Sequence, residues 1–410
     1  MYRRHLLARV RAALADTPAV ALIGPRQSGK TTLARQLAAH MGAQYFTFDD
    51  AATLAAASDP AGFIQGLHGA AIIDEVQKAP AVLPAIKVEI DRRRVPGRFL
   101  LTGSANLWRL PAVSESLTGR VEVATLYPLS QGELRGLREG LIDALFQDAP
   151  LRLRRPASPG QSLEAVIAVG GFPEALARRE GRRREAWFDS YVTTLLLRDV
   201  RDLSRIEGAA ELPRFLRLLA ACSSGLLNTS ELSRSCGIPN TTLKRYLALL
   251  ETLFLVQPLA AWSANLGKRL VKAPKLHLVD CGLAMHLLGL SAERLRADRH
   301  AIGPLLETFA VGELRKQAAW SETAVTLHHY RSAAGAEVDI VLEDRRGRVA
   351  GVEVKAAAGV GRRDFAGLES LAEALSERFV RGVVLYGGSQ VVPFGERLHA
   401  LPLRALWDLG

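Results

Sequence analysis

Short apolar runs recur in the first quarter of the chain and predict a parallel β-sheet. Residues 20–23, 70–73 and 98–101 are mostly apolar and lack the alternation of a half-exposed strand. Strands buried on both faces of a parallel sheet have this pattern. Helical spacing follows the first run, in LARQLAAH, and also marks residues 1–16, where arginines lie between apolar residues. The pattern therefore predicts an α/β fold with an amphipathic N-terminal helix.

The rest of the chain changes from helical to alternating spacing. Residues 187–202 and 213–225 have helical spacing, and so does a later segment, 304–314. After this last helix come a strand at 327–330 and a strand, turn and strand. These two strands span residues 335–342 and 349–355. The C-terminal third is therefore predicted to hold a smaller sheet of its own.

The charge is unusual for a chain with 48% hydrophobic residues. Lys and Arg number 53 against 42 Asp and Glu, which gives a formal net charge of +11. A polyanionic partner such as nucleic acid is one interpretation, and an arginine-rich solvated surface is the other. The stretch 178–184 carries five arginines and allows the same two interpretations.

Several classes of protein are excluded by simple counts. Cys222, Cys236 and Cys281 are an odd number at wide spacing, which fits neither a disulfide framework nor a paired zinc site. No apolar stretch is long enough for a transmembrane helix, and the N-terminus does not read as a signal peptide. We therefore expect a cytoplasmic protein without a membrane partner.

The strongest motif follows the first apolar run and reads GPRQSGKTT. Gly24, Gly29, Lys30 and Thr31 match the phosphate-loop pattern, and a predicted strand and helix flank it. The loop amides and the helix N-terminus would face the phosphates of ATP. Lys30 would neutralise the β- and γ-phosphates, and the Thr31 hydroxyl would bind Mg²⁺. The predicted nucleotide-binding residues are Gly24, Pro25, Arg26, Gln27, Ser28, Gly29, Lys30, Thr31 and Thr32.

A second apolar run supplies the carboxylates that such a site needs. Residues 70–73 lead directly into Asp74 and Glu75. We predict that Asp74 holds the Mg²⁺ through water and that Glu75 orients the attacking water as the base. Together with the phosphate loop, this pair predicts an enzyme that hydrolyses ATP to ADP and phosphate.

Three further residues are candidates for sensing or stabilising the γ-phosphate. Ser104 and Asn106 follow the strand at 98–101, and ligands bind at the carboxyl ends of parallel strands. Arg120 is the candidate cation for the transferred phosphate, in its own site or in that of a neighbouring subunit of a homo-oligomer. The alternative for Arg120 is a surface arginine that caps a helix.

These motifs, in the order GPRQSGKTT, IIDEVQ, LLTGSAN, ESLTGR and Pro-Leu-Ser, resemble the AAA+ branch found beside a DUF4143 region in bacterial and archaeal ATP-binding proteins. The resemblance covers nearly the whole chain. It implies that Lys30 and Thr31 belong to Walker A, that Asp74 and Glu75 belong to Walker B, and that Ser104 lies near sensor 1. No clear sensor 2 arginine is present.

A helix-turn-helix is predicted between the two sheets. A Ser/Thr-rich cap begins one short helix near residue 228, Gly237 ends it, and a second helix begins at Asn240 or Thr241. Residues 254–256 and 268–275 are the candidate strands of a wing. The second helix would enter a DNA major groove, or the module would bind proteins. The candidate DNA-binding residues are Asn240, Thr241, Lys244 and Arg245.

Acidic residues and a lysine gather in the predicted C-terminal sheet. Alternation along the two later strands lets Asp339, Glu353 and Lys355 converge, and Glu307 arrives from the helix before them. Carboxylates that bind a second Mg²⁺ or Mn²⁺, with a lysine that positions water, suit phosphodiester cleavage. The set resembles the PD-(D/E)xK nuclease fold, especially its archaeal Holliday-junction resolvase form, but no proline precedes Asp339. A charged hairpin without activity is the alternative.

The expected fold is therefore α/β, with four units in place of the three that 410 residues suggest at about 150 per domain. They are an AAA+ P-loop domain with a parallel sheet, a helical connector or lid, a winged helix-turn-helix and a nuclease-like α/β domain. Their expected limits are 1–140, 141–210, 211–275 and 276–410.

The leading hypothesis is an ATPase that couples ATP binding and hydrolysis to DNA binding or processing. The alternative is a nucleotide-gated protein-interaction or signalling switch whose nuclease-like domain is inactive. A ring-shaped helicase or translocase is a third interpretation.

Overall fold

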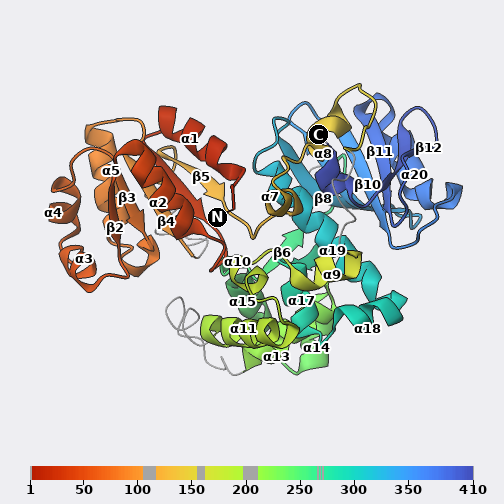
Figure 1. The fold of residues 1–410 in the computed structure, drawn as a ribbon, viewed down its shortest axis with the longest axis horizontal. Helices are drawn as coiled ribbons and strands as arrows, with labels where there is room; N and C mark the ends of the chain where they lie inside the picture. Colours follow the sequence, from red (N-terminus) through yellow and green to blue (C-terminus); the bar gives the residue numbers. More distant parts are fainter. Residues whose placement is uncertain are drawn as a thin grey trace. The chain divides into compact units, whose positions relative to one another are not determined.

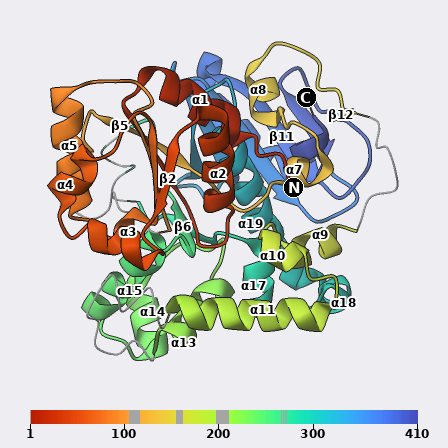
Figure 2. The same cartoon turned by 60° about the vertical axis from the view of Figure 1, so that its left-hand side comes forward.

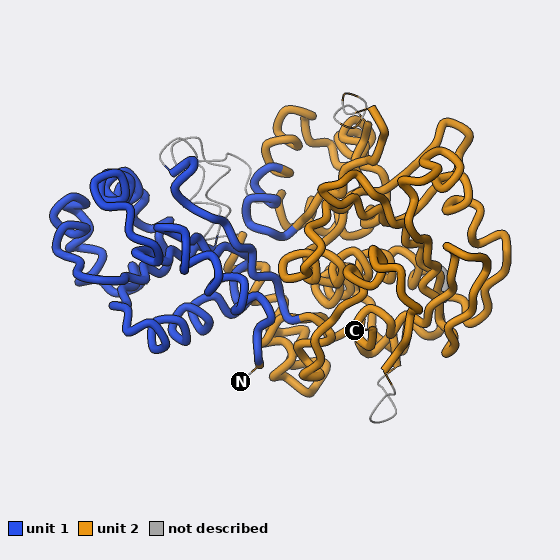
Figure 3. Tube along the Cα trace, turned by 90° about the horizontal axis from the view of Figure 1, so that it is seen from above, with its two compact units in different colours: residues 1, 3–129, 248–255 blue, residues 2, 130–247, 256–410 orange. Residues whose placement is uncertain are grey.

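A computed structural model describes residues 2–104, 117–154, 162–196, 211–265, 267, 269 and 272–409. The chain divides into two compact units, coloured separately in Figure 3. The first is built mainly of residues 3–129 with 248–255, and the second of residues 130–247 and 256–410. Each unit contains a β-sheet with helices around it (Figure 1).

The first unit contains a five-stranded sheet in the order β2-β3-β4-β1-β5, and each adjacent pair is parallel. The predicted apolar runs form its centre, and every residue of β1, β3 and β4 is buried. Strand β2 was not predicted from the sequence, because it is a partly exposed edge strand without an apolar run. The strands are β1 (Ala19–Ile23), β2 (Gln44–Thr47), β3 (Ala71–Asp74), β4 (Phe99–Gly103) and β5 (Val121–Thr125).

Helices cover this sheet (Figure 2), and the local sequence explains where they begin. Asp50 accepts a hydrogen bond from the Thr53 amide at 2.8 Å, and Asp59 caps the next helix in the same way. The predicted N-terminal helix is present and buries its apolar side. The helices are α1 (Leu6–Asp16), α2 (Lys30–Met41), α3 (Ala51–Ala56), α4 (Pro60–Gln65), the 3₁₀ turn η1 (Val76–Lys78) and α5 (Val82–Arg92).

The second unit begins with short helices and continues into longer ones. The predicted helix at 187–202 is α11, which begins earlier, at Gly181, and ends at Thr194. Residues 197–210 lie outside the described residues. The helices of this part are α7 (Gln131–Arg135), α8 (Leu141–Phe146), α9 (Leu163–Val169), α10 (Pro173–Leu176), α11 (Gly181–Thr194), α13 (Leu212–Ala221), α14 (Thr229–Cys236), α17 (Cys281–Leu287) and α18 (Ala292–Ala297). Helix α15 (Asn240–Thr252) belongs to this unit up to residue 247 and to the first unit from residue 248.

Helices α14 and α15 and a two-stranded ribbon occur in the predicted order. Asn228 caps α14 by accepting the Glu231 amide at 3.1 Å, and Gly237 ends it in the left-handed conformation. Strands β6 (Val256–Leu259) and β7 (Lys275–Leu278) pair antiparallel. The predicted wing strands were 254–256 and 268–275, so β6 and β7 begin at the residues where these were expected to end. For β6 the reason is Phe254, whose φ of 58° turns the chain after α15.

The C-terminal sheet has six strands in the order β12-β13-β11-β10-β9-β8. Strands β9 and β10 form the expected hairpin, β8 pairs antiparallel with β9, and β11 pairs parallel with both β10 and β13. Helix α19 (Arg299–Ala318) precedes the sheet and begins five residues before Pro304, where the helix was predicted to start. The strands are β8 (Val325–Arg331), β9 (Glu337–Asp344), β10 (Val349–Lys355), β11 (Phe379–Tyr386), β12 (Val392–Pro393) and β13 (Leu398–Pro402).

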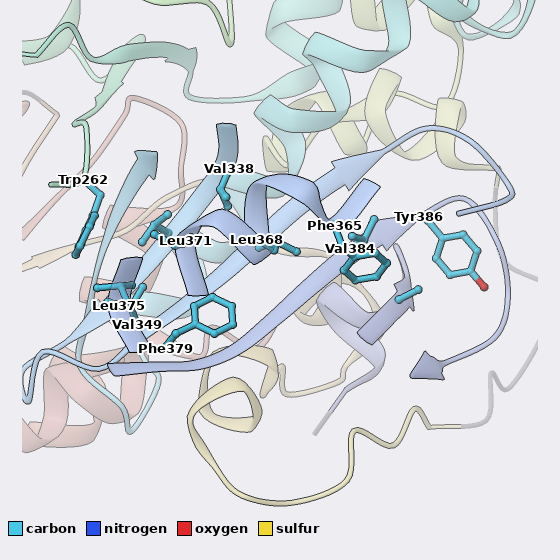
Figure 4. Packing of buried hydrophobic residues seen from close by; sticks show 12 residues of the cluster. Trp262, Val338, Val349, Phe365, Leu368, Leu371, Leu375, Phe379, Val384 and Tyr386 are labelled. Carbon is cyan, nitrogen blue, oxygen red and sulfur yellow. The ribbon is translucent and has the colours of Figure 1, made fainter. Parts of the chain in front are cut away.

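One face of this sheet packs on α20 (Ala366–Leu375), where the core of the domain lies (Figure 4). Leu368 and Leu371 project from the helix toward the sheet, and Val338 meets them from β9. Gly351 in β10 makes the close approach possible, because a Cβ there would lie 2.5 Å from a Leu368 methyl carbon. With Val338 on the α20 face, strand alternation places Asp339 on the opposite face. The short helix α21 (Ala405–Asp408) ends the chain.

Cys222, Cys236 and Cys281 are all free thiols. Among the residues that the structure describes, no helix has both the length and the apolar character needed to cross a membrane.

Candidate functional site

The phosphate loop connects β1 to α2, as the sequence predicted. Gly24, Gln27 and Gly29 have φ values of 150°, 64° and 97°, so three of its six residues have positive φ. A Cβ at Gly24 would lie 2.2 Å from the Leu126 carbonyl oxygen, so no other residue fits there. Arg26 is half-buried and Thr32 is exposed at the start of α2. The sharp turn brings the N-terminus of α2 to the edge of the sheet where nucleotides bind.

Two cations hold this loop in shape. The Lys30 ammonium donates to the carbonyl oxygens of Gly24 at 3.0 Å and Pro25 at 2.8 Å. Arg4, just before α1, donates to the carbonyls of Ser28 at 2.7 Å and Tyr127 at 2.6 Å. Arg4 therefore ties the loop to the segment after β5, a role that sequence analysis did not assign.

Asp74 lies at the end of β3 within a network of hydroxyl groups. Its Oδ2 atom accepts hydrogen bonds from Thr31 Oγ1 at 3.0 Å and from the Tyr45 hydroxyl at 2.6 Å, and Thr102 donates to Oδ1. Burial and the hydrogen bond to Asp74 raise the pKa of Tyr45 to about 12, so Tyr45 remains a donor at neutral pH. The guanidinium carbon of Arg35 lies 5.2 Å from the centre of the Tyr45 ring. The predicted magnesium ligands Thr31 and Asp74 are therefore adjacent, and both offer the oxygen atoms that Mg²⁺ prefers.

Glu75 follows Asp74 and has a left-handed backbone with φ 58°. Such a conformation costs a non-glycine residue about 1–3 kcal/mol and is concentrated at functional sites. Its carboxylate accepts hydrogen bonds from Gln77 and, at 3.2 Å, from Ser104 Oγ. Gln77 also donates to Ser104 Oγ at 2.9 Å. The structure therefore brings the predicted base Glu75 and Ser104 together and adds Gln77 as their common partner.

The other two candidates for the phosphate site have different positions. Asn106 lies outside the described residues. Arg120 forms a two-pronged ion pair with Asp91 of α5, at 2.5 and 2.9 Å, and donates to the Thr118 carbonyl. In this conformation the Arg120 guanidinium is engaged with a carboxylate and not with the phosphate loop.

The C-terminal candidate site gathers around a lysine that sequence analysis did not include. Lys275, at the start of β7, donates to Glu307 Oε1 at 2.7 Å and to Asp339 Oδ1 at 3.3 Å. All three side chains are nearly buried, with 10%, 12% and 14% of their surface exposed. The ammonium group of Lys275 therefore lies between two of the predicted metal ligands.

The other predicted members complete the cluster from β10. Asp339 Oδ2 accepts the Val354 amide at 2.9 Å, and the Asp339 amide donates to Glu353 Oε2 at 3.3 Å. Lys355 donates to Glu353 Oε1 at 2.8 Å. The four residues predicted to converge, Glu307, Asp339, Glu353 and Lys355, thus form one connected group with Lys275.

Burial shifts the protonation of this cluster. Burial first, and then the Asp339 charge, raises the pKa of Glu307 to about 8, although Lys275 opposes the shift. The same two causes raise the pKa of Glu353 to about 7. Burial tends to lower the pKa of Lys275, but the Glu307 and Asp339 carboxylates outweigh it, so the pKa is raised. Lys275 is therefore charged at neutral pH.

The geometry does not fit the predicted second metal ion. Within the described ranges, no group of three or more His, Cys, Asp or Glu residues is arranged to hold a metal ion. The physical reason is Lys275, whose ammonium group contacts Glu307 Oε1 and Asp339 Oδ1, two oxygens that a cation would need. The expected metal centre at Glu307, Asp339 and Glu353 is thus replaced by an ion-paired cluster.

The predicted DNA-binding residues lie on the first turns of α15. Thr241, Lys244 and Arg245 are exposed, whereas Asn240 is half-buried at the start of the helix. Leu243 and Leu250 on the opposite side are buried. The helix therefore presents its polar side chains to solvent, as a groove-binding helix or a protein-binding helix would.

A phosphate loop between a parallel strand and a helix, with an Asp-Glu pair at the end of another strand of the same sheet, defines a P-loop protein of the AAA class. Comparison with protein families agrees, since residues 16–135 match the family described as AAA domain. Residues 160–294 and 302–406 match two domains of unknown function, DUF8612 and DUF4143.

Two mycobacterial relatives match the whole chain. They are the uncharacterized proteins Rv2008c of Mycobacterium tuberculosis and Mb2031c of Mycobacterium bovis. Each is 33% identical over 416 aligned residues, which cover 100% of this chain and 85% of the relative. The chain belongs to this family of AAA-domain proteins with a C-terminal DUF4143 region. Among solved structures, the Walker-type ATPase PABY2304 of Pyrococcus abyssi is similar with a TM-score of 0.39 and 16% identity, over 70% of this chain and 96% of that one.

Proposed function

We propose that the protein is a Mg²⁺-dependent ATPase whose catalytic site lies at the carboxyl ends of β1, β3 and β4. The observation that carries this proposal is the 3.0 Å contact between Thr31 Oγ1 and Asp74 Oδ2 directly below the phosphate loop. Mg²⁺ would supply charge neutralisation for the phosphates and would be held by the Thr31 hydroxyl and, through water, by Asp74. Lys30 would exchange its two carbonyl partners for phosphate oxygens.

Glu75 is the proposed base that orients and deprotonates the attacking water. Gln77 and Ser104 fix its carboxylate, so the base is positioned before nucleotide arrives. Arg120 remains our candidate for stabilising transferred phosphate charge, in the neighbouring subunit of a homo-oligomer, after release from Asp91.

The test is ATP turnover by the full chain with Mg²⁺ and with a chelator. The wild type should release phosphate only with Mg²⁺. Glu75→Gln should bind nucleotide normally but lose turnover by about 100-fold or more, because the amide cannot accept a proton. Turnover that persists in Glu75→Gln would contradict the role of Glu75, and absence of turnover in the wild type would contradict the ATPase proposal.

We further propose that nucleotide state is coupled to DNA binding through α15. Support comes from the exposed Lys244 and Arg245 on the first turns of a helix that follows a capped helix and a three-residue turn. The net charge of +11 adds a general attraction for polyanions.

Salt dependence distinguishes DNA binding from protein binding. DNA affinity should fall steeply with salt, and changing both Lys244 and Arg245 to Ala should reduce the slope of log affinity against log salt by about 2. Changing Arg214 and Arg217 of α13 to Ala removes the same charge elsewhere and is the matched control. ATP turnover should also be measured with duplex, branched and single-stranded DNA. If both double variants weaken DNA binding equally, α15 is not the helix that binds DNA.

The alternative function is a nucleotide-gated switch that binds another protein. The ion pairs of Lys275 with Glu307 and Asp339 favour it, because they leave the nuclease-like domain without the expected metal ligands. This alternative predicts weak DNA affinity even at low salt, together with nucleotide-dependent association with a protein partner.

A further inference from the structure

Lys275 occupies the position in the C-terminal cluster where a divalent cation would be expected. Its Nζ atom lies 2.7 Å from Glu307 Oε1 and 3.3 Å from Asp339 Oδ1. A divalent cation would need these oxygens at about 2.0–2.6 Å. An ammonium group and a metal ion cannot occupy this space together, because both require the same lone pairs and both are positive.

His277 provides an unused donor atom beside the cluster. It lies two residues after Lys275 on β7 and is 1% exposed. Its Nδ1 atom shares a hydrogen bond with Thr308 Oγ1 at 3.2 Å, whereas Nε2 is buried without a hydrogen-bond partner. That Nε2 atom is 3.9 Å from Glu307 Oε1, so it faces the cluster. An unpaired ring nitrogen beside a buried carboxyl group is unusual, because buried polar atoms are nearly always paired.

The charge balance of the cluster supports a resident lysine. Glu307, Asp339 and Glu353 place three carboxyl groups in a nearly buried space, and among the residues that the structure describes only Lys275 pairs with both Glu307 and Asp339. Lys355 lies at the rim, with 37% of its side chain exposed, and pairs with Glu353 alone among the described ion pairs. The two lysines therefore differ in position, since one fills the centre and the other borders it.

We infer that Lys275 is the resident cation of the nuclease-like site, that it excludes divalent metal ions there, and that its removal opens a metal site formed by Glu307, Asp339 and Glu353. His277 Nε2 is the fourth donor within reach of that site. The inference concerns the C-terminal site alone, so it stands or falls independently of the proposed ATPase.

Mn²⁺ binding to the full chain without nucleotide tests this inference, with calorimetry and Mn²⁺ electron paramagnetic resonance as readouts. Lys275→Ala should bind Mn²⁺ at least about tenfold more tightly than the wild type, because it removes a competing charge and its bulk. Adding Asp339→Asn should abolish the gain. Lys355→Ala removes the same charge from the rim and should leave Mn²⁺ affinity within about threefold of the wild type.

Three results would overturn the inference. One is a wild type that binds Mn²⁺ as tightly as Lys275→Ala, in a manner that depends on Asp339. Another is an equal gain in Lys355→Ala, which would indicate a general charge effect. The third is a Lys275→Ala protein that gains no Mn²⁺ affinity.

A measurement on the wild type covers the case in which Lys275→Ala does not fold. An amine-acylating reagent followed by mass spectrometry reports the reactivity of each lysine. Lys275 should react much more slowly than the exposed Lys244, and millimolar Mn²⁺ should leave it protected. Faster modification of Lys275 with Mn²⁺ would show that the metal displaces the lysine, which contradicts exclusion.

Discussion

Two buried lysines, one in each unit, are surrounded by oxygen atoms of different kinds. Lys30 in the phosphate loop donates to the carbonyls of Gly24 and Pro25, which carry no net charge. Lys275 in the C-terminal cluster donates to the carboxylates of Glu307 and Asp339. Carbonyl oxygens orient an ammonium group, whereas carboxylates neutralise it.

The difference shows how similar side chains can be prepared for opposite tasks. An ammonium group held by carbonyls retains its attraction for an incoming phosphate anion. Lys275 has its charge matched within the protein by Asp339, while Glu307, whose pKa is raised to about 8, is mostly protonated at neutral pH. Removing Asp339 would therefore leave an unpaired buried charge. The first arrangement suits ligand binding, and the second suits a closed, self-sufficient centre.

The sharpest way to break this comparison is Lys30→Ala. Loss of the phosphate-facing cation should lower ATP turnover by about 100-fold or more and weaken nucleotide binding. The half-buried Lys87 of α5 offers a matched control, Lys87→Ala, which should retain wild-type turnover. Phosphate release and fluorescent-nucleotide binding measure the two effects. Normal turnover in Lys30→Ala would remove the reason for treating the first lysine as a ligand-binding one.

A smaller effect is expected from Gln77→Ala, which releases Glu75 and Ser104 from their common partner. The turnover number should fall by about tenfold while the Michaelis constant changes little, because the base loses its position but nucleotide contacts remain. In the Glu75→Gln background the same change should cost nothing further. Additive losses in the double variant would mean that Gln77 acts independently of Glu75.

Titration of Glu307 in the C-terminal cluster should make the free energy of unfolding depend on pH. Burial raises the pKa of Glu307 from 4.5 to about 8, so the folded chain holds this proton more tightly than the unfolded chain does. The contribution of Glu307 to stability is therefore greatest below pH 4.5 and declines as the pH rises to about 8. Glu307→Gln cannot titrate and should flatten this decline in the free energy of unfolding.

Denaturant titrations at about pH 5 and about pH 8 measure this difference. Glu337→Gln on the exposed side of β9 is the control and should follow the wild-type profile. If the free energy of unfolding of Glu307→Gln falls with pH as steeply as that of the wild type, Glu307 is not the group whose proton is held more tightly in the folded chain.

The smallest effect is expected from Tyr45→Phe in the first unit. This change removes one hydrogen bond to Asp74 and should lower the free energy of unfolding by about 1 kcal/mol. Turnover should fall by less than about tenfold, since Thr31 and Thr102 still hold the carboxylate. Thermal unfolding and phosphate release test the two parts. A loss as large as that of Lys30→Ala would mean that Tyr45 contacts the nucleotide.

The nucleotide site was largely predictable from the sequence because its chemistry is contiguous. Lys30 and Thr31 stand side by side in one loop, and Asp74 and Glu75 stand side by side at the end of one apolar strand. Parallel pairing of buried strands brings these two segments together. The edge strand β2 lacks an apolar run, so Tyr45 and its contact with Asp74 were missed.

The C-terminal cluster was only half predictable. Alternation along β9 and β10 predicted that Asp339 and Glu353 converge, and in the structure the Asp339 amide donates to Glu353 Oε2. Lys275 is 32 residues from Glu307 and 64 from Asp339 along the chain. No local pattern reports such a contact, because it depends on how β7 packs beside α19 and β9. His277 shares this limitation, since its orphan nitrogen is defined only by its surroundings.

Arg4 shows that a functional domain can begin before the region that sequence similarity delimits. The AAA match starts at residue 16, whereas the guanidinium that fastens the phosphate loop to the segment after β5 is at position 4, ahead of α1. A fragment cut at the similarity boundary would retain every residue of GPRQSGKTT and yet lose two of the bonds that shape it. Excision of this ATPase module therefore has to follow hydrogen bonds and not alignment limits.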